Sequence, residues 1–467
     1  MVSNTKKIRK QGEMKELYTK NSKIFIGLYI FFIFGAAMGD WKVLNVALGA
    51  LPKVVSVGVV GLAAAYVLWT GNFRNFKLLS RFGLLFSSII IGIILCSILT
   101  WIIDFQTIGY IVKGVSKISY QFLNIAIVLC AVYMFEDKAA KYTFFGLAAA
   151  NFVIILLGMA STGPVGALRD LIANITSFGA NDVIVNSKFI RAIEIHDITF
   201  VMGVYVLYFL FFTPGEKYRY LYAATALFFF FAGLKRIAFL SLLVAALFAC
   251  FCMLLGPRGK RVTLMLSAVI IVIFCYFYIV IIQDGTFTKF CIEHDIELNG
   301  RERIYDYISN FYKVSPSYRG KGYEFCVHLL KSMKGTKDQV VNINAVHNDI
   351  LKMYVEMGFW GFAAWILGYY IYQTRWYIDR CGEKTAVCFI VINIYMLVTY
   401  MTDNTMFYYW SSMVIRMIPL SFFFAPVKSI VLKETDVFRM NRFERWLHRK
   451  RQKEKEWRRE PKMRIEK

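Results

Sequence analysis

His347 is the residue whose type and position best suit proton transfer. It stands in the run HNDILKMYVEMGFWG, beside Asn348 and Asp349, where a polar segment leads into an apolar one. An unperturbed histidine has a pKa of about 6.5, so near neutral pH much of it is free base and can take a proton from a hydroxyl group. We expect His347 to be a catalytic base; a structural role as a helix cap is the alternative.

Basic residues upstream of His347 suit the binding of an anion. Arginine presents a planar fork of donors to phosphate oxygens, and a helix that begins at Arg236 adds its own N–H groups and the positive end of its dipole. Gly320 and Gly322 would let backbone approach the anion closely. The expected phosphate ligands are Arg191, Arg236, Arg301, Arg303 and Arg319, with Lys321 in support. Each one singly also fits a solvated or snorkelling side chain, so the prediction depends on their convergence.

A polar stripe follows His347 along the same predicted helix. Lys352 and Glu356 are four residues apart and share a face with Asn348, so they should point away from lipid. These three residues are expected to support the site. The alternative is an internal ion pair that only packs this helix against its neighbours.

Composition indicates what kind of fold must position these residues. The 467 residues are 58% hydrophobic and 18% charged, with a mean hydropathy of +0.50. A soluble protein cannot hide so much apolar surface, which predicts an all-α polytopic integral membrane protein. The net charge of +24 gathers mostly at the two ends of the chain, so no nucleic-acid partner is expected. The cysteines form no CxxC pair, and neither a metal nor a cofactor is expected.

Apolar runs predict about twelve transmembrane helices, because a bilayer core of about 30 Å needs roughly 20 apolar residues. The predicted spans are 23–39, 53–71, 82–103, 118–135, 142–162, 197–213, 219–233, 236–255, 262–282, 348–371, 385–402 and 405–425. An even number of spans puts both termini on one side, and the basic ends favour the cytoplasm.

Three regions follow from these spans. They are a basic cytoplasmic N-terminus at 1–22, a transmembrane domain at 23–427 and a basic cytoplasmic tail at 428–467. Outer loops are expected at 163–196 and, between the ninth and tenth spans, at 284–346. Cys291 and Cys326 both fall in the larger loop, and the sequence leaves open whether they form a disulfide.

Four stretches in this order resemble motifs of the O-antigen ligase and O-antigen or capsular polysaccharide polymerase (Wzy-like) superfamily. They are GLKRIAFL, NGRERIYDY, PSYRGKGYEF and HNDILKMYVEMGFWG. The first departs from the family pattern at Lys235, where a serine or threonine is usual. The choice between Arg301 and Arg303 as the arginine of the second motif stays open.

The resemblance implies a glycosyltransferase of a bacterial inner (plasma) membrane. It would transfer glycan from a polyprenyl diphosphate-linked donor to a hydroxyl of a lipid-linked repeat unit on the outer face, with inversion and without metal. His347 would be the base and the arginines would hold the donor diphosphate. The expected partners are the lipid-linked oligosaccharide and the bilayer, with a chain-length regulator left open.

Two alternative functions remain. An O-antigen-type ligase would use the same donor but attach the glycan to a final lipid or protein acceptor, and the TDN run at 402–404 favours the polymerase over it. A lipid-linked oligosaccharide flippase or secondary transporter would need matching halves with broken helices and midplane charges, which the sequence does not display.

Overall fold

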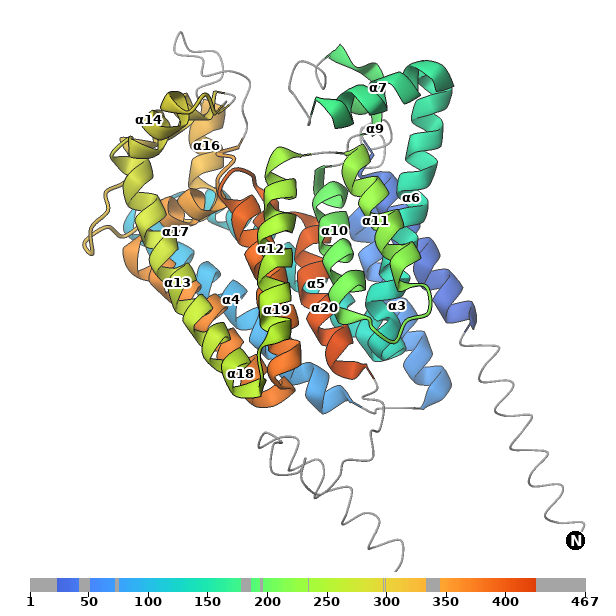
Figure 1. The fold of residues 1–467 in the computed structure, drawn as a ribbon. Helices are drawn as coiled ribbons and strands as arrows, with labels where there is room; N and C mark the ends of the chain where they lie inside the picture. The colour runs from blue at the N-terminus through green and yellow to red at the C-terminus, as the bar shows by residue number, and fades with distance from the viewer. Residues whose placement is uncertain are drawn as a thin grey trace, which may run out of the picture.

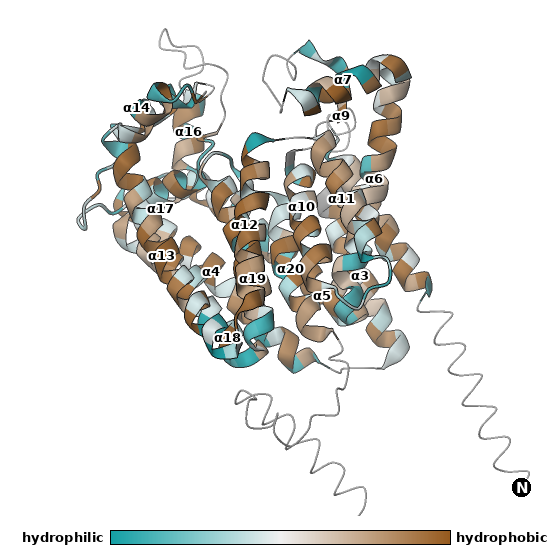
Figure 2. Cartoon of the chain, viewed as in Figure 1, coloured by the Kyte–Doolittle hydropathy of each residue, from teal (hydrophilic) through white to brown (hydrophobic). Residues whose placement is uncertain are grey.

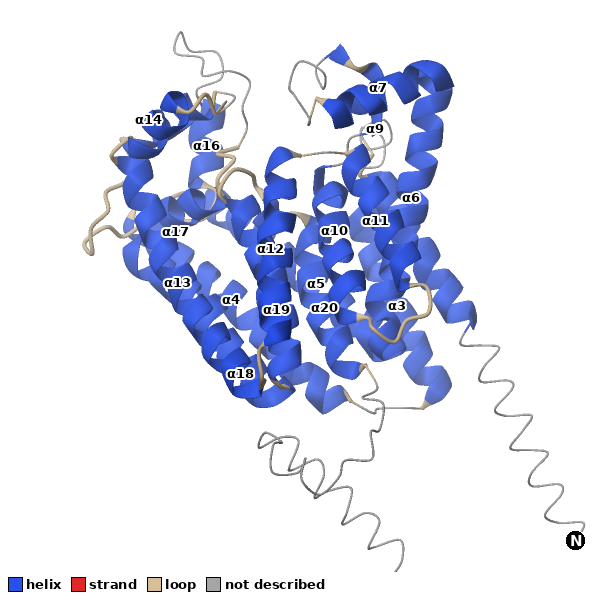
Figure 3. Ribbon diagram, viewed as in Figure 1, coloured by secondary structure: helices blue, strands red, loops and turns tan. Residues whose placement is uncertain are grey.

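The computed structural model describes residues 23–41, 51–71, 75–177, 186–193, 196–233, 235–296, 298, 300–332 and 345–425. These residues form helices joined by loops, and no strand occurs among them (Figure 3). The basic ends predicted to be cytoplasmic, 1–22 and 428–467, lie outside the described residues.

Long, roughly parallel helices build most of the molecule (Figure 1). The N-terminal helix Lys23–Gly39 comes first. It is followed by α3 (Leu51–Thr70), α4 (Phe76–Ile103), α5 (Ile108–Phe135), α6 (Ala139–Thr162), α10 (His196–Leu207), α11 (Arg219–Ala232), α12 (Arg236–Leu254), α13 (Pro257–Gln283), α17 (Asp349–Ile366), α18 (Gln373–Cys381), α19 (Glu383–Tyr400) and α20 (Tyr409–Phe424). Each of the predicted spans coincides with helix in this set.

Six helical segments in the described part are long and apolar enough to cross a membrane. They are Phe76–Ile103, Ile108–Thr162, Arg236–Leu254, Pro257–Gln283, Asp349–Cys381 and Glu383–Tyr400, and shorter apolar helices accompany them. Large apolar side chains of these helices are exposed, for example Leu95, Leu247 and Ile273. Hydrophobic residues cover much of the length of the long helices (Figure 2). Such surface is costly in water and suits contact with lipid. The chain is therefore an all-α polytopic membrane protein, as predicted.

Short helices gather at one end of this bundle (Figure 1). They come from the two long predicted loops: α7 (Pro164–Thr176) and α9 (Lys188–Ile193) from the first, and α14 (Thr286–Glu293), α15 (Arg301–Ser309) and α16 (Phe325–Ser332) from the second. The predicted loops are therefore partly helical, and they form the end of the bundle at which α12 and α17 begin.

Candidate functional site

His347 is held in an uncommon backbone conformation at the start of α17. Its φ is +52°, in the left-handed region that costs a non-glycine residue roughly 1 kcal/mol or more. The backbone N–H of His347 donates to Asn404 Oδ1 at 3.1 Å. Its Nδ1 atom lies 3.3 Å from Asn404 Nδ2 and 3.6 Å from Asp403 Oδ1. The short loop between α19 and α20 thus fixes the imidazole ring.

The two residues after His347 anchor the same segment more deeply. Asn348 is fully buried and caps α17, because its side chain accepts the N–H of Leu351 at 2.9 Å. Its Nδ2 donates to the hydroxyl of Tyr278 on α13 at 3.1 Å. Asp349 accepts the backbone N–H of Met406 at 2.7 Å. With the two residues after it held in place, His347 keeps 35% of its side chain exposed and faces a place that a ligand can reach.

Arg301 is linked to this segment electrostatically, through Tyr305. It begins α15 directly after Gly300, whose φ of +79° starts the helix sharply. Burial raises the pKa of Tyr305, one turn further along α15, to about 12, while the charge of Arg301 lowers it and that of Asp403 raises it. Tyr305 therefore lies within electrostatic reach of both Arg301 and the loop that holds His347. Arg301 is half-buried and Arg303 is exposed, which favours Arg301 as the site residue.

The other predicted phosphate ligands lie on different elements. Arg236 is exposed at the first position of α12, which packs along α19 and begins at the end where α19 leads into Asp403 (Figure 1). Arg191 lies exposed on α9, and its Nε donates to the carbonyl of Ser187 at 3.4 Å. Arg319 is exposed in the loop before α16. Among the described residues, the polar contacts of His347 are with Asp403 and Asn404, so convergence of these arginines on it stays a prediction.

The predicted polar stripe of α17 is buried inside the protein. Lys352 is 8% exposed and Glu356 is fully buried. The ammonium of Lys352 lies 3.9 Å from Glu324 Oε1 and 5.0 Å from the centre of the Tyr323 ring. Glu324 also forms an ion pair with Lys117 of α5.

Glu356 has a separate partner within this stripe. It accepts the backbone N–H of Cys326 at 3.2 Å through Oε1. The ion pair of Lys352 therefore crosses to the segment before α16 rather than staying within α17.

Gly320 and Gly322 pack against α17, a contact that differs from the close approach to an anion predicted for this pair. The N–H groups of Lys321 and Gly322 donate to the carbonyl of Glu356 at 3.2 and 2.8 Å. These N–H groups are thus already used, at the point where Gly358 bends α17 with φ 70° and ψ −178°. A Cβ on Gly320 would lie 2.5 Å from the nitrogen of Gly358. These two segments can therefore approach so closely only with glycine at both positions. The motif serves the bend in α17. The role of Lys321 as a supporting side chain stays a prediction.

Cys291 and Cys326 are both buried and both free, which answers the question that the sequence left open.

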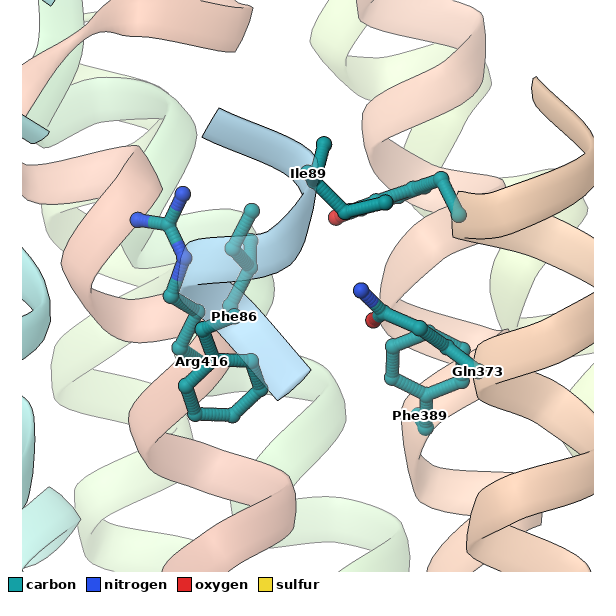
Figure 4. A pocket seen from close by; sticks show the side chains of 7 residues that line it. Phe86, Ile89, Gln373, Phe389 and Arg416 are labelled. Atoms are coloured by element: carbon teal, nitrogen blue, oxygen red, sulfur yellow. The ribbon is translucent and has the colours of Figure 1, made fainter. Parts of the chain in front are cut away.

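A charged residue further down the bundle, Arg416 of α20, belongs to a different place. It lines a small pocket together with Phe86, Ile89, Tyr369, Gln373, Phe389 and Ile415 (Figure 4). Its Nη1 donates to Asn124 Oδ1 at 2.9 Å and to the carbonyl of Ser412 at 2.7 Å. Neutral acceptors thus satisfy this guanidinium, and we assign it no part in the histidine site.

Three of the predicted site residues, Arg236, Arg301 and His347, fall in one continuous stretch of chain, from the head of α12 through α15 to the start of α17. Residues 221–366 match the O-antigen ligase family. The matched segment begins in α11, ends with α17, and contains Arg236, Arg301 and His347. No curated protein matches the chain at a significant level.

The loop that holds His347 lies outside the O-antigen ligase segment. From the sequence, its TDN run at 402–404 favoured a polymerase, but no contact of this run with His347 was predicted. Asp403 and Asn404 follow α19, beyond the matched residues. A cluster of polar residues between two apolar runs was the available signal. Neither its contact with His347 nor that between Glu324 and Lys352 could be read from spacing, because each joins segments far apart in the chain.

Proposed function

We propose that this protein is a polysaccharide polymerase of a bacterial plasma membrane. It transfers glycan from a polyprenyl diphosphate-linked donor to a hydroxyl of a lipid-linked repeat unit, on the outer face and with inversion. The observation that carries the proposal is His347, half-open at the head of α17 and held by Asp403 and Asn404, within a segment that matches the O-antigen ligase family.

The geometry of His347 suits a general base. Nδ1 is directed to Asp403 and Asn404, which leaves Nε2 as the nitrogen available to an acceptor hydroxyl. For Nε2 to be the base, the ring hydrogen must be on Nδ1 and point to the Asp403 carboxylate at 3.6 Å, in place of the hydrogen bond that Nδ1 accepts from Asn404 Nδ2 at 3.3 Å. Nε2 then keeps a lone pair and accepts the proton as the hydroxyl oxygen attacks the anomeric carbon. The carboxylate then stabilises the imidazolium that forms. The bond from the anomeric carbon to the donor phosphate breaks, and its electron pair leaves with the lipid diphosphate.

The leaving diphosphate gains negative charge as that bond breaks. Tyr305 on α15 lies within electrostatic reach of both Arg301 and Asp403, and Arg236 begins α12 at the same end of the bundle (Figure 1). Guanidinium groups placed in advance stabilise such charge more in the transition state than in the ground state, so they speed the chemical step. Arg191, Arg319 and Lys321 are proposed as further contacts to the donor head group.

The test uses purified protein in lipid nanodiscs with a polyprenyl diphosphate-linked repeat unit, and follows the product ladder. We expect His347→Gln to slow elongation by about 10² to 10⁴. The matched control is His294→Gln, an exposed histidine that follows α14 at the same end of the molecule, and it should elongate at the wild-type rate. A ladder from His347→Gln at the wild-type rate would refute the role of His347.

The description of the matched family supports a second candidate, an O-antigen-type ligase. A ligase uses the same donor and the same base, so the two functions differ only in acceptor. A ladder built from the repeat unit alone shows a polymerase. A single transfer to a different lipid or protein acceptor, without a ladder, shows a ligase. Movement of intact donor across a sealed vesicle without transfer would show a transporter and overturn both.

A further inference from the structure

Helix α5 and the segment around α16 form a second cationic surface, which the proposed reaction has not used. On α5, Tyr110, Lys113 and Lys117 fall on one face at spacings of three and four residues. On the other segment, Glu324, His328 and Lys331 do the same. We call these six residues the α5–α16 seam.

Two contacts fix how the halves of the seam meet. The rings of Tyr110 and His328 are 4.7 Å apart, and Lys117 forms an ion pair with Glu324. The two segments therefore run antiparallel along this contact. Lys113 lies between the two contacts, and Lys331 lies one turn beyond His328.

The seam carries more positive than negative charge. Glu324 is its one carboxylate, and this group is 6% exposed and already shared between Lys117 and Lys352. Lys113 and Lys331 are exposed, and in the described part of the chain neither forms an ion pair. Burial is the largest cause that lowers the pKa of His328, and the charge of Lys113 is the next. The charges of Lys117 and Lys331 lower this pKa as well. Two lysines are thus available to an anion at this surface.

The seam is joined directly to the proposed active site. Glu324 is 3.9 Å from Lys352, which lies on the helix that His347 precedes. Tyr323, next to Glu324, packs against Phe407 of the loop between α19 and α20 with ring centres 5.4 Å apart. A ligand at the seam would therefore lie on elements that also support His347. The proposed donor ligand Arg301 is on a different element, α15.

We propose that the α5–α16 seam binds the diphosphate of the acceptor lipid, a second diphosphate site beside that of the donor. This inference rests on the proposed function. A polymerase needs such a site because its acceptor carries a lipid diphosphate of its own, whereas the anchor used by a ligase does not require one. Flexible ammonium groups at an exposed surface suit a phosphate that must arrive and leave at every cycle. Anionic phospholipid head groups offer the same chemistry, so the test separates these two sources.

The experiment compares two acceptors at a fixed concentration of lipid-linked donor. One acceptor is the repeat unit on prenyl diphosphate, and the other is the same repeat unit on an alkyl chain without phosphate. Wild-type protein should prefer the first. We expect the double variant Lys113→Gln/Lys331→Gln to reduce this preference about tenfold, through a higher KM for the phosphate-bearing acceptor and an unchanged kcat. The matched control is Arg169→Gln on α7, whose side chain is 84% exposed at the same end of the bundle, and it should keep the preference.

Two controls keep the outcomes separate. The unfolding temperature of the double variant should equal that of wild type, because both lysines are exposed. The assay is repeated in nanodiscs of phosphatidylcholine alone and with phosphatidylglycerol. A preference that is unchanged in the variant, or that changes only when phosphatidylglycerol is present, overturns the acceptor site.

If wild type elongates neither acceptor, the proposed function fails. The diphosphate site at the seam is then tested by a binding measurement instead. Native mass spectrometry then counts sugar-free prenyl diphosphates bound to wild type and to the double variant. One fewer bound molecule in the variant supports a diphosphate site at the seam. Equal numbers overturn it.

Discussion

The Nδ1 atom of His347 lies 3.6 Å from Oδ1 of Asp403, and Asp403 is 9% exposed. This carboxylate is fixed in turn, because its Oδ1 accepts the N–H of Asn404 at 2.8 Å. A buried carboxylate beside one imidazole nitrogen orients the ring and stabilises its protonated form. The loop after α19 therefore supplies a positioning group for the proposed base.

Replacing Asp403 with asparagine should test this pairing. The variant keeps the size of the side chain but loses its negative charge, so the imidazolium formed during proton transfer is less stable. We expect kcat for elongation to fall about 10²-fold while KM for the donor stays the same. Single-turnover transfer with saturating donor measures the effect. Wild-type kcat in Asp403→Asn would show that the carboxylate only packs the loop.

A comparison of neighbouring arginines should decide which one faces the diphosphate. Arg301 is half-buried beside Tyr305, and Arg303 is exposed on the same helix. We expect Arg301→Gln to slow transfer about 10²-fold and Arg303→Gln to change it less than threefold. The two variants serve as controls for each other, because each removes one positive charge from α15. Equal losses, or a larger loss in Arg303→Gln, would reverse the assignment.

Periodicity and composition predicted the membrane fold because the need for about 20 apolar residues per span is strong and local. The spans at 82–103 and 236–255, for example, coincide with α4 and α12. His347 at the head of a helix was predictable for the same reason, since a cap lies next to the helix it begins.

The partners of these residues were not predictable in the same way. The approach of Asp403 to His347, and of Glu324 to Lys352, depends on how α16, α17 and the loop after α19 pack in three dimensions. The packing of Gly320 and Gly322 on α17 was not predicted, because glycines that approach a phosphate and glycines that approach a helix look identical in sequence. Only their neighbours, Gly358 and Trp101, distinguish the two cases.

Removing the charge of Lys352 should destabilise the fold more than removing an exposed lysine. Lys352→Met leaves the buried Glu324 with Lys117 as its ion-pair partner and removes the cation above the Tyr323 ring. Breaking one partner of a buried pair costs roughly 3 kcal/mol, so the unfolding temperature should fall by several degrees.

The double variant Lys352→Met/Glu324→Gln should recover part of this loss, because Glu324, which keeps only Lys117 as an ion-pair partner in the single variant, is then replaced by a neutral side chain. Thermal unfolding in the same detergent compares the variants. A double variant that loses the full sum of the two single effects would show that the charges of Lys352 and Glu324 do not interact.

The bend at Gly358 should tolerate no side chain. Its φ of 70° with ψ of −178° is a conformation that residues other than glycine rarely adopt, and a Cβ there would lie 2.2 Å from the carbonyl carbon of Arg319. We expect Gly358→Ala to cost about 2 kcal/mol or more of stability and to displace the loop that pairs with Glu356. The control is Gly92→Ala in α4, where a Cβ meets nothing within 4 Å and helix propensity favours alanine. Thermal unfolding should show a lower unfolding temperature than wild type for Gly358→Ala and an equal or higher one for Gly92→Ala. Equal unfolding temperatures for Gly358→Ala and wild type would mean that this bend does not require glycine.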